Sequence, residues 1–345
     1  RLNAAISAIP ELKVPSMVVR VSSGRVDFLK GRERCLGLHN VNGRTRRKGD
    51  LIEFNAKCHS NLWESIIIKG QYEAPGFKLR SQITINQLRP HAVADYFFPQ
   101  SDLKMTNARA NLTLDLQTDG PHHLQASASG SIPYMYWHRG NKDLKITDTR
   151  FQCEFQLKDQ AVSLSITQLD LLDPSLSLAG RLKLNPEPPS IQLALEGKQI
   201  NVATAHKVAT ALTENSDTVS DIFEILRAGD FQRITLNVTG PNWAHLAEFE
   251  NYVIRGNIIG GNIFISEGQL NLEDVKGDAT IANGILQGEN IEARMGNSSA
   301  RQGKIAIALT DDTAPFHIEG LIQADLSQLP SVLTRLIENK QFRKE

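Results

Sequence analysis

Apolar and polar residues alternate with a period of two along most of this 345-residue chain. This period indicates strands with one apolar and one polar face. Parallel strands are buried on both faces and give continuous apolar runs, so the alternation favours an antiparallel sheet over a doubly wound α/β fold. The clearest segments are Leu112 to Leu116, Phe151 to Leu157, Val162 to Ile166, Ile191 to Leu195, Ile234 to Val238, Ile263 to Ile265, Leu270 to Leu272 and Ile305 to Leu309.

A few segments change to a helical period. Val219, Ile222, Phe223 and Leu226 form an apolar stripe after Asp217, and Gly229 is placed to end that helix. Similar stripes begin after Asn201 and after Ser327. We therefore predict helices near 202–212, 217–228 and 327–338, with weaker candidates at 90–98 and 242–253.

Two patterns recur along the chain. In the first, a glycine stands between two apolar residues within a strand, at Gly70, Gly130, Gly180, Gly277 and Gly320. Such a glycine indicates a bend, a bulge or a close backbone approach. In the second, a strand is followed by Asn or Asp and then by a helical segment, at Asn86, Asn201 and Asp325. These patterns predict three modules, 1–100, 101–215 and 216–345, in one elongated unit.

The predicted helices are too few to cover the apolar faces of so many strands. The fold class we predict is therefore mostly β with a few short amphipathic helices. In it, a repetitive antiparallel sheet curls into an elongated groove, and a β-sandwich is the alternative. Aromatic residues make up only 6% of the chain, so the apolar faces are aliphatic. Such faces suit a sandwich core and an acyl-chain groove equally.

The formal net charge is 0, with 38 basic and 38 acidic residues, which argues against a nucleic-acid partner. Residues 1 to 50 nevertheless carry 11 Lys/Arg and 4 Asp/Glu, a local charge of 11 − 4 = +7. We predict that Arg44, Arg46, Arg47 and Lys48 form a hairpin tip after a turn at Asn42-Gly43. These four residues, with the aromatic pair Tyr136 and Trp137, are candidate contacts to a membrane or an acidic partner, although a solvated loop and an ordinary strand are the simpler interpretations.

Sequence motifs for catalysis or metal binding are absent. The chain has no phosphate-binding glycine loop, no nucleophile elbow and no paired cysteine or histidine spacing for a metal. Three cysteines, Cys35, Cys58 and Cys153, are too few for a disulfide scaffold, and either a Cys35 to Cys58 bridge or three free thiols would fit. We expect no enzyme, no cofactor and no bound metal.

The C-terminal part resembles the AsmA-like superfamily, which includes the YhdP and TamB type proteins of Gram-negative envelopes. The resemblance is carried by Asn262 to Leu272, Val275 to Ala279, Gly284 to Leu286, Ile291 to Ala293 and the strand, Asp and helix ending at 315–336, and more loosely by 26–98. It implies a repeating β-groove in a periplasmic protein that an N-terminal helix tethers to the inner membrane. It also implies a role in phospholipid transport to the outer membrane. The chain starts at Arg1 without that helix, so we expect a fragment of a longer protein.

The function we expect is a non-enzymatic segment that binds or conducts lipid and shields acyl chains between the two membranes. The expected partners are a phospholipid or another acyl lipid, the remainder of the same longer chain and envelope proteins. A structural scaffold without a lipid groove is the alternative, and a β-helical polysaccharide lyase is a third, weaker one because the repeats are too long. The predicted groove lining is Leu112, Leu114, Leu116, Val162, Leu164, Ile166, Ile263, Ile265, Leu270 and Leu272.

Overall fold

The structure is a computed structural model that describes residues 16–30, 33–97, 102, 104–212, 217–266, 269–309, 317–327 and 330. Within these residues all eighteen strands belong to one sheet. The strands are β1 (Ser16–Lys30), β2 (Glu33–Lys48), β3 (Leu51–Ser60), β4 (Ser65–Glu73), β5 (Lys78–Leu88), β6 (Lys104–Thr106), β7 (Ala110–Asp119), β8 (His123–Arg139), β9 (Lys142–Lys158), β10 (Ala161–Leu171), β11 (Leu176–Asn185), β12 (Ser190–Asn201), β13 (Leu226–Gly240), β14 (Tyr252–Ile265), β15 (Leu270–Ala282), β16 (Ile285–Met295), β17 (Ser298–Ala308) and β18 (His317–Gln323).

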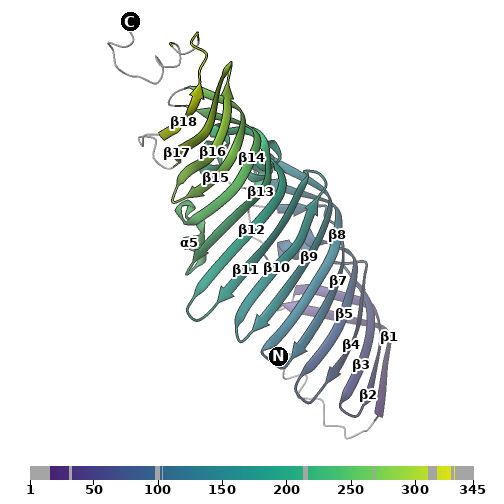
Figure 1. The fold of residues 1–345 in the computed structure, drawn as a ribbon. Coiled ribbons are helices and arrows are strands. Elements are labelled where there is room, and N and C mark those ends of the chain that lie inside the picture. The colour runs from purple at the N-terminus through teal and green to yellow at the C-terminus, as the bar shows by residue number, and fades with distance from the viewer. Residues whose placement is uncertain are drawn as a thin grey trace.

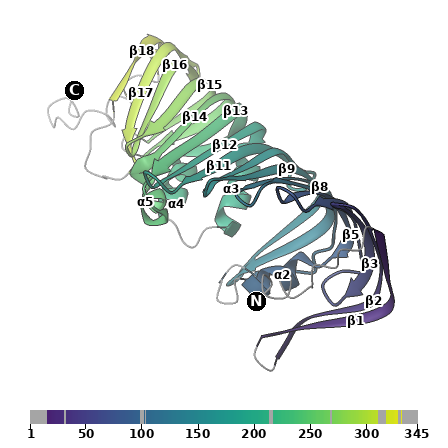
Figure 2. The ribbon, with the colours of Figure 1, turned by 90° about the horizontal axis from the view of Figure 1, so that it is seen from below.

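The strands follow one another as an antiparallel meander. Each pairs with its neighbour in the chain, except that β5 pairs with β7 and the short β6 adds to the end of β8. β1 and β18 lie at opposite ends of the sheet (Figure 1). The sheet curves into an elongated, open trough (Figure 2), so the predicted antiparallel groove is confirmed.

Four helices accompany the sheet within the described residues: α2 (Pro90–Phe97), α3 (Val202–Leu212), α4 (Asp217–Ile225) and α5 (Trp243–Ala247). The helix predicted near 217–228 ends three residues early, because Leu226 begins β13 and pairs with Ile263. Gly229, predicted as the helix end, lies inside β13 with a φ of +127°. The candidate at 242–253 is shorter than predicted, since β14 begins at Tyr252. The helix predicted at 327–338 falls outside the described residues except for Ser327 and Pro330.

The prediction that the basic residues 44–48 form a hairpin tip after a turn at Asn42-Gly43 is wrong. Asn42 and Gly43 lie inside β2, and the turn comes later at Gly49 and Asp50, between the paired residues Lys48 and Leu51. Gly49 has a φ of +60°, which suits the turn, whereas the Asn42 side chain accepts a hydrogen bond from the Ser23 amide at 3.1 Å. The basic residues 44–48 therefore belong to a strand that is paired on both sides.

Helix α2 and the pair α3 and α4 follow strands that end at one edge of the sheet, whereas α5 follows the end of β13 at the opposite edge. We call the first of these edges the helical rim; there β5, β12 and β18 end at Leu88, Asn201 and Gln323. Apart from the short β6, six strands, β7 to β12, lie between the first two of these ends, and six more, β13 to β18, lie between the last two. An even number of antiparallel strands returns the chain to the edge from which it started. The sheet runs unbroken across both predicted module boundaries, so the division into three modules stays a prediction.

The recurring glycines at 70, 130 and 180 are close-approach positions. A Cβ built on Gly130 would lie 2.5 Å from the backbone oxygen of Asn111 and 2.8 Å from Cζ of Phe151. A Cβ on Gly70 would lie 2.6 Å from the ring of Phe54, and one on Gly180 would lie 2.6 Å from Cδ2 of Leu195. In each case the missing side chain makes room for a large apolar one on the neighbouring strand.

A line of bulges follows the helical rim. Near this rim Asn40, Gln87, Gln199, Asn290 and Gln302 have φ values between +50° and +53°. The strand register shifts beside these positions in most of the pairs, for example between Ile85 and Leu88. Bulges bend a strand and increase its twist, so their alignment accounts for the bending of this wall of the trough.

Asparagine side chains replace ladder hydrogen bonds at several bulges. Asn111 Oδ1 accepts from the Gln87 amide at 2.9 Å, and Asn257 Oδ1 accepts from the Arg233 amide at 3.3 Å. The Asn42 to Ser23 bond described above is a third case. A backbone amide that loses its partner in the ladder is thus satisfied from the adjacent strand.

Candidate functional site

One face of the sheet carries an unbroken apolar row. The row starts at Val21 in β1, continues with the residue that pairs with Val21 in β2, then with the partner of that residue in β3, and so on. It contains one residue from each of the sixteen strands β1 to β5 and β7 to β17, and all sixteen residues are apolar. The row is Val21, Gly43, Ala56, Ile68, Ile83, Leu114, Ala128, Cys153, Ile166, Gly180, Leu195, Leu236, Ile254, Ile281, Leu286 and Ile307.

The adjacent row, on the other face, is polar. From β1 to β13 it contains one apolar member, Ala194. The row is Arg20, Arg44, Asn55, Lys69, Gln82, Asp115, Ser127, Glu154, Ser165, Arg181, Ala194 and Asn237. The two faces therefore differ in chemistry along most of the length of the sheet.

The apolar face is the inner face of the trough. Helices α3 and α4 pack against β12, β13 and β14 on this side and lie in the opening of the trough (Figure 2). Most of the apolar row is only half-buried, and Leu195 is 38% and Val21 47% exposed. A long strip of aliphatic surface thus faces a space that the protein itself does not fill.

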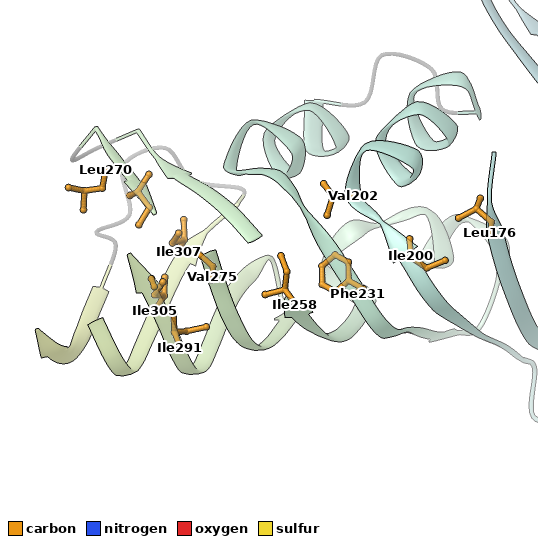
Figure 3. Close-up of a cluster of buried hydrophobic side chains, with 12 residues drawn as sticks. Leu176, Ile200, Val202, Phe231, Ile258, Leu270, Val275, Ile291, Ile305 and Ile307 are labelled. Carbon is orange, nitrogen blue, oxygen red and sulfur yellow. The ribbon is translucent and has the colours of Figure 1, made fainter. Parts of the chain in front are cut away.

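A cavity of about 500 Å³ lies between α3, α4 and the sheet. None of its lining residues is charged, and Tyr252 is the one that carries a polar side-chain atom. The helices contribute Val202, Ala205, Ala209, Val219, Ile222 and Phe223, and the strands contribute Ile234, Leu236, Ile254, Ile258, Ile263, Ala279, Ile281 and Leu286 among others. Phe231 and Ile258 lie on the inner side of the sheet, and Val202 lies at the start of α3, in the same cluster of buried side chains (Figure 3).

Local contacts hold the two helices over this cavity. Asn201 Oδ1 accepts from the amides of Ala203 and Thr204 at 3.0 and 3.3 Å, which caps the start of α3. The rings of His206 in α3 and Phe223 in α4 stack with their centroids 4.4 Å apart. The helices thereby act as a partial cover for the trough at β12 to β14.

The structure places all ten predicted lining residues on the inner face. Ile166 and Leu114 belong to the apolar row, and Ile263 lines the cavity. Ile265 and Leu270 are 1% and 6% exposed, so they form the core of the wall rather than an open lining. The remaining five, Leu112, Leu116, Val162, Leu164 and Leu272, are half-buried; contact with lipid stays a prediction for all ten.

The candidate contact residues divide between the two faces. Arg44, Arg46 and Lys48 are exposed on the outer face, where Lys48 pairs with Glu53 at 3.4 Å, while the Arg47 guanidinium donates to the Gly49 carbonyl at 2.9 Å. Tyr136 is exposed with the Lys145 ammonium 5.9 Å from its ring centroid. Trp137 instead packs beside Met135, to whose sulfur its Nε1 donates at 3.1 Å. Trp137 is therefore part of the core rather than a surface contact.

The described cysteines are thiols. Cys58 is buried and free, so it forms no bridge with Cys35, and Cys153 in the apolar row is also free. Burial raises the pKa of both thiols. Each is therefore less reactive at neutral pH than an exposed thiol.

Groups suited to bond-making chemistry are sparse in the parts of the chain that the structure describes. They contain no set of three or more His, Cys, Asp or Glu side chains placed to hold a metal. Hydrogen bonds from Gln168 and Ser177 lower the pKa of Asp170, which keeps this carboxylate ionised. No helix among the described residues is long and apolar enough to cross a membrane.

A larger hollow, of about 840 Å³, lies on the outer face across β3 to β10. Its lining carries both signs of charge, including Glu53, Lys69, Arg80, Asp115 and Glu154. These residues are spread over many strands and do not converge on a point. We therefore take the apolar trough, and not this outer hollow, as the candidate functional site.

Part of the cavity lining was not predicted from the sequence. Leu236, Ile254, Ile281 and Leu286 were not among the predicted lining residues, although the first belongs to a segment whose alternation is clear. The helical residues Val202, Ala205, Val219 and Ile222 were recognised as apolar stripes, but their common target was not. That the two stripes face one cavity depends on the pairing of β12, β13 and β14, which periodicity does not reveal.

We compared the chain with protein-family models, with curated proteins and with solved structures, and none of them matches it.

Proposed function

We propose that this chain is a non-enzymatic segment that binds or conducts acyl lipid along its trough, within an AsmA-like protein of a bacterial envelope. The observation that carries the proposal is the apolar row from Val21 to Ile307, which crosses sixteen strands without a polar side chain. A catalytic site needs a few converging polar groups, whereas an acyl chain needs only continuous aliphatic surface. The periplasmic location, the tether to the inner membrane and the phospholipid cargo belong to this proposal.

The energetics favour this kind of ligand. Burying each CH2 group is worth about 0.8 kcal/mol, so eight groups of one acyl chain would contribute about 6 kcal/mol before ordering costs. The half-exposed side chains of the row supply that surface. Polar headgroups need not enter the trough, because one side of it is open (Figure 2).

Native mass spectrometry with lipid extraction tests the proposal directly. We expect the purified chain to carry phospholipid, or to take it up from vesicles at near-stoichiometric occupancy. A clean mass without lipid, unchanged after incubation with phospholipid vesicles, would contradict the proposal for this chain and favour the scaffold interpretation.

A cysteine in the trough provides an independent prediction. Cys153 lies in the apolar row, so bound lipid is expected to slow its alkylation by a maleimide several-fold in a Cys35→Ser, Cys58→Ala background. Because burial raises the pKa of Cys153, the rate without lipid should increase with pH, and it should do so at higher pH than the rate of an exposed thiol. Alkylation is followed by mass spectrometry.

The matched control moves the thiol to the outer face. Ser129 is exposed, pairs with Gln152 and lies next to Ala128 of the row, so Ser129→Cys with Cys153→Ala exposes a thiol on the other side of β8. Lipid should leave its alkylation unchanged. Equal protection of both thiols would mean that lipid does not bind selectively in the trough.

A further inference from the structure

We propose that a pocket at the helical rim, beside the turn between β3 and β4, binds the phosphate group of a phosphate ester. The pocket has a volume of about 480 Å³. Its lining residues come from β2, β3, β5, β8 and the segments next to them. They are His39, His59, Ser60, Trp63, Glu64, Gln87, Arg89, Arg109 and Tyr134.

Among the described lining residues of the pocket, the basic side chains outnumber the acidic ones. Within the described part of the chain, neither the Arg89 nor the Arg109 side chain forms an ion pair or hydrogen bond. Glu64 is the one carboxylate among the lining residues. The rings of His39 and His59 stack with centroids 6.0 Å apart and add two imidazoles to the same wall. Two guanidinium groups against one carboxylate favour an anionic ligand.

The donors in the lining suit phosphate oxygens. A guanidinium presents a planar fork of N–H groups that matches two phosphate oxygens. Ser60 and Tyr134 add hydroxyl groups and Gln87 adds an amide.

The pocket is next to the apolar trough. His39 and His59 directly follow Leu38 and Cys58, whose side chains belong to the apolar cluster of Cys58, Ile66 and Ile85 on the inner face. Trp63 packs against that cluster and also lines the pocket. The two histidines face the side of the sheet opposite to this cluster, close to the helical rim, so a phospholipid that passes over this edge could place its phosphate in the pocket and its chains in the trough. This lipid form of the inference rests on the proposed function, whereas phosphate binding itself does not.

The experiment has a soluble arm and a lipid arm. In the first, inorganic phosphate and sn-glycerol 3-phosphate are titrated by calorimetry into the wild-type chain and into Arg89→Gln, Arg109→Gln and the double variant. In the second, each variant is incubated with an equal mixture of phosphatidylglycerol and diacylglycerol of the same acyl chains, and bound lipid is extracted and quantified. Arg255→Gln, an exposed position on β14 outside the pocket, is the control for loss of charge. Circular dichroism verifies that each variant is folded.

We expect the wild-type chain to bind glycerol 3-phosphate and to load phosphatidylglycerol in preference to diacylglycerol. The double variant should bind glycerol 3-phosphate at least about tenfold more weakly, and Arg255→Gln should behave as wild type. Loss of the phosphatidylglycerol preference, with total lipid loading retained, would identify the phosphate as a lipid headgroup. An unchanged preference with lost glycerol 3-phosphate binding would identify a soluble phosphate ester.

Absence of phosphate binding to the wild-type chain, together with lipid selectivity that the arginine variants do not change, would overturn the inference. Failure of every variant to load either lipid would contradict the proposed function alone, because the soluble arm would still report on the pocket.

Discussion

Leu195→Asp is expected to weaken acyl-lipid binding by about thirtyfold, because a carboxylate placed against an acyl chain costs about 2 kcal/mol or more. Leu195 lies in the middle of the apolar row, between Gly180 and Leu236. Its side chain is 38% exposed, so part of it faces the open space of the trough. Lipid occupancy is measured by native mass spectrometry and folding by circular dichroism.

Ala194→Asp is the matched control. Ala194 is the preceding residue of the same strand, is exposed and faces the polar side of the sheet, next to Arg181. The control introduces the same charge without placing it in the trough, and we expect lipid occupancy at the wild-type level. If the two variants bind lipid equally well while both are folded, the middle of the trough does not contact the acyl chain.

Gly130→Ala is expected to lower the free energy of unfolding by about 2 kcal/mol, because the added methyl group has no room. It would lie 2.5 Å from the Asn111 backbone oxygen and 2.8 Å from the Phe151 ring. The ring could move, but the backbone oxygen belongs to the paired strand β7 and could do so only with that strand. Urea unfolding followed by circular dichroism measures the change.

Gly43→Ala tests whether that loss comes from crowding or from glycine replacement in general. Gly43 lies in the apolar row, and the nearest atom to a Cβ there is the Asn55 oxygen at 3.5 Å, an ordinary contact. This variant should be as stable as wild type or slightly more so, since alanine reduces the freedom of the unfolded chain. Equal destabilisation by both substitutions would show that close approach at Gly130 is not the cause.

The strands were predictable because their signal is local. Alternation at Leu112 to Leu116 or Val162 to Ile166 depends only on which residues face the same side of a strand. The turn between β2 and β3 was not predictable in this way. Asn42-Gly43 has the composition of a tight turn, but Asn42 is used to satisfy the Ser23 amide at a bulge, a contact nineteen residues away.

The predicted end of α4 was wrong for a related reason. Leu226 fits the apolar stripe of α4, but pairing with Ile263 in β14 extends β13 back to this residue. Gly229 stands where a helix C-cap is expected, but its positive φ occurs inside strand β13. At these positions the sequence allows both a helix and a strand, and pairing with a strand that is distant in the sequence determines that a strand forms.

The candidate site was partly predictable. Which residues are apolar and share a strand face follows from the period, so all ten predicted lining residues lie on the inner face. How deeply each of these side chains is buried does not follow from the period. Ile265 is covered because Leu270 and the neighbouring strands pack on it, and the pocket with Arg89 and Arg109 joins residues from β2 to β8 that carry no common motif.

The six-strand interval between successive ends at the helical rim limits how a protein of this kind can change in length. Adding or deleting a hairpin keeps the next helical segment on the same edge, whereas a change of a single strand would move it to the opposite edge. Each added strand extends the trough by about 4.8 Å. The length of such a trough can therefore change in steps of about 10 Å while the segments that follow strands at the helical rim stay on that edge.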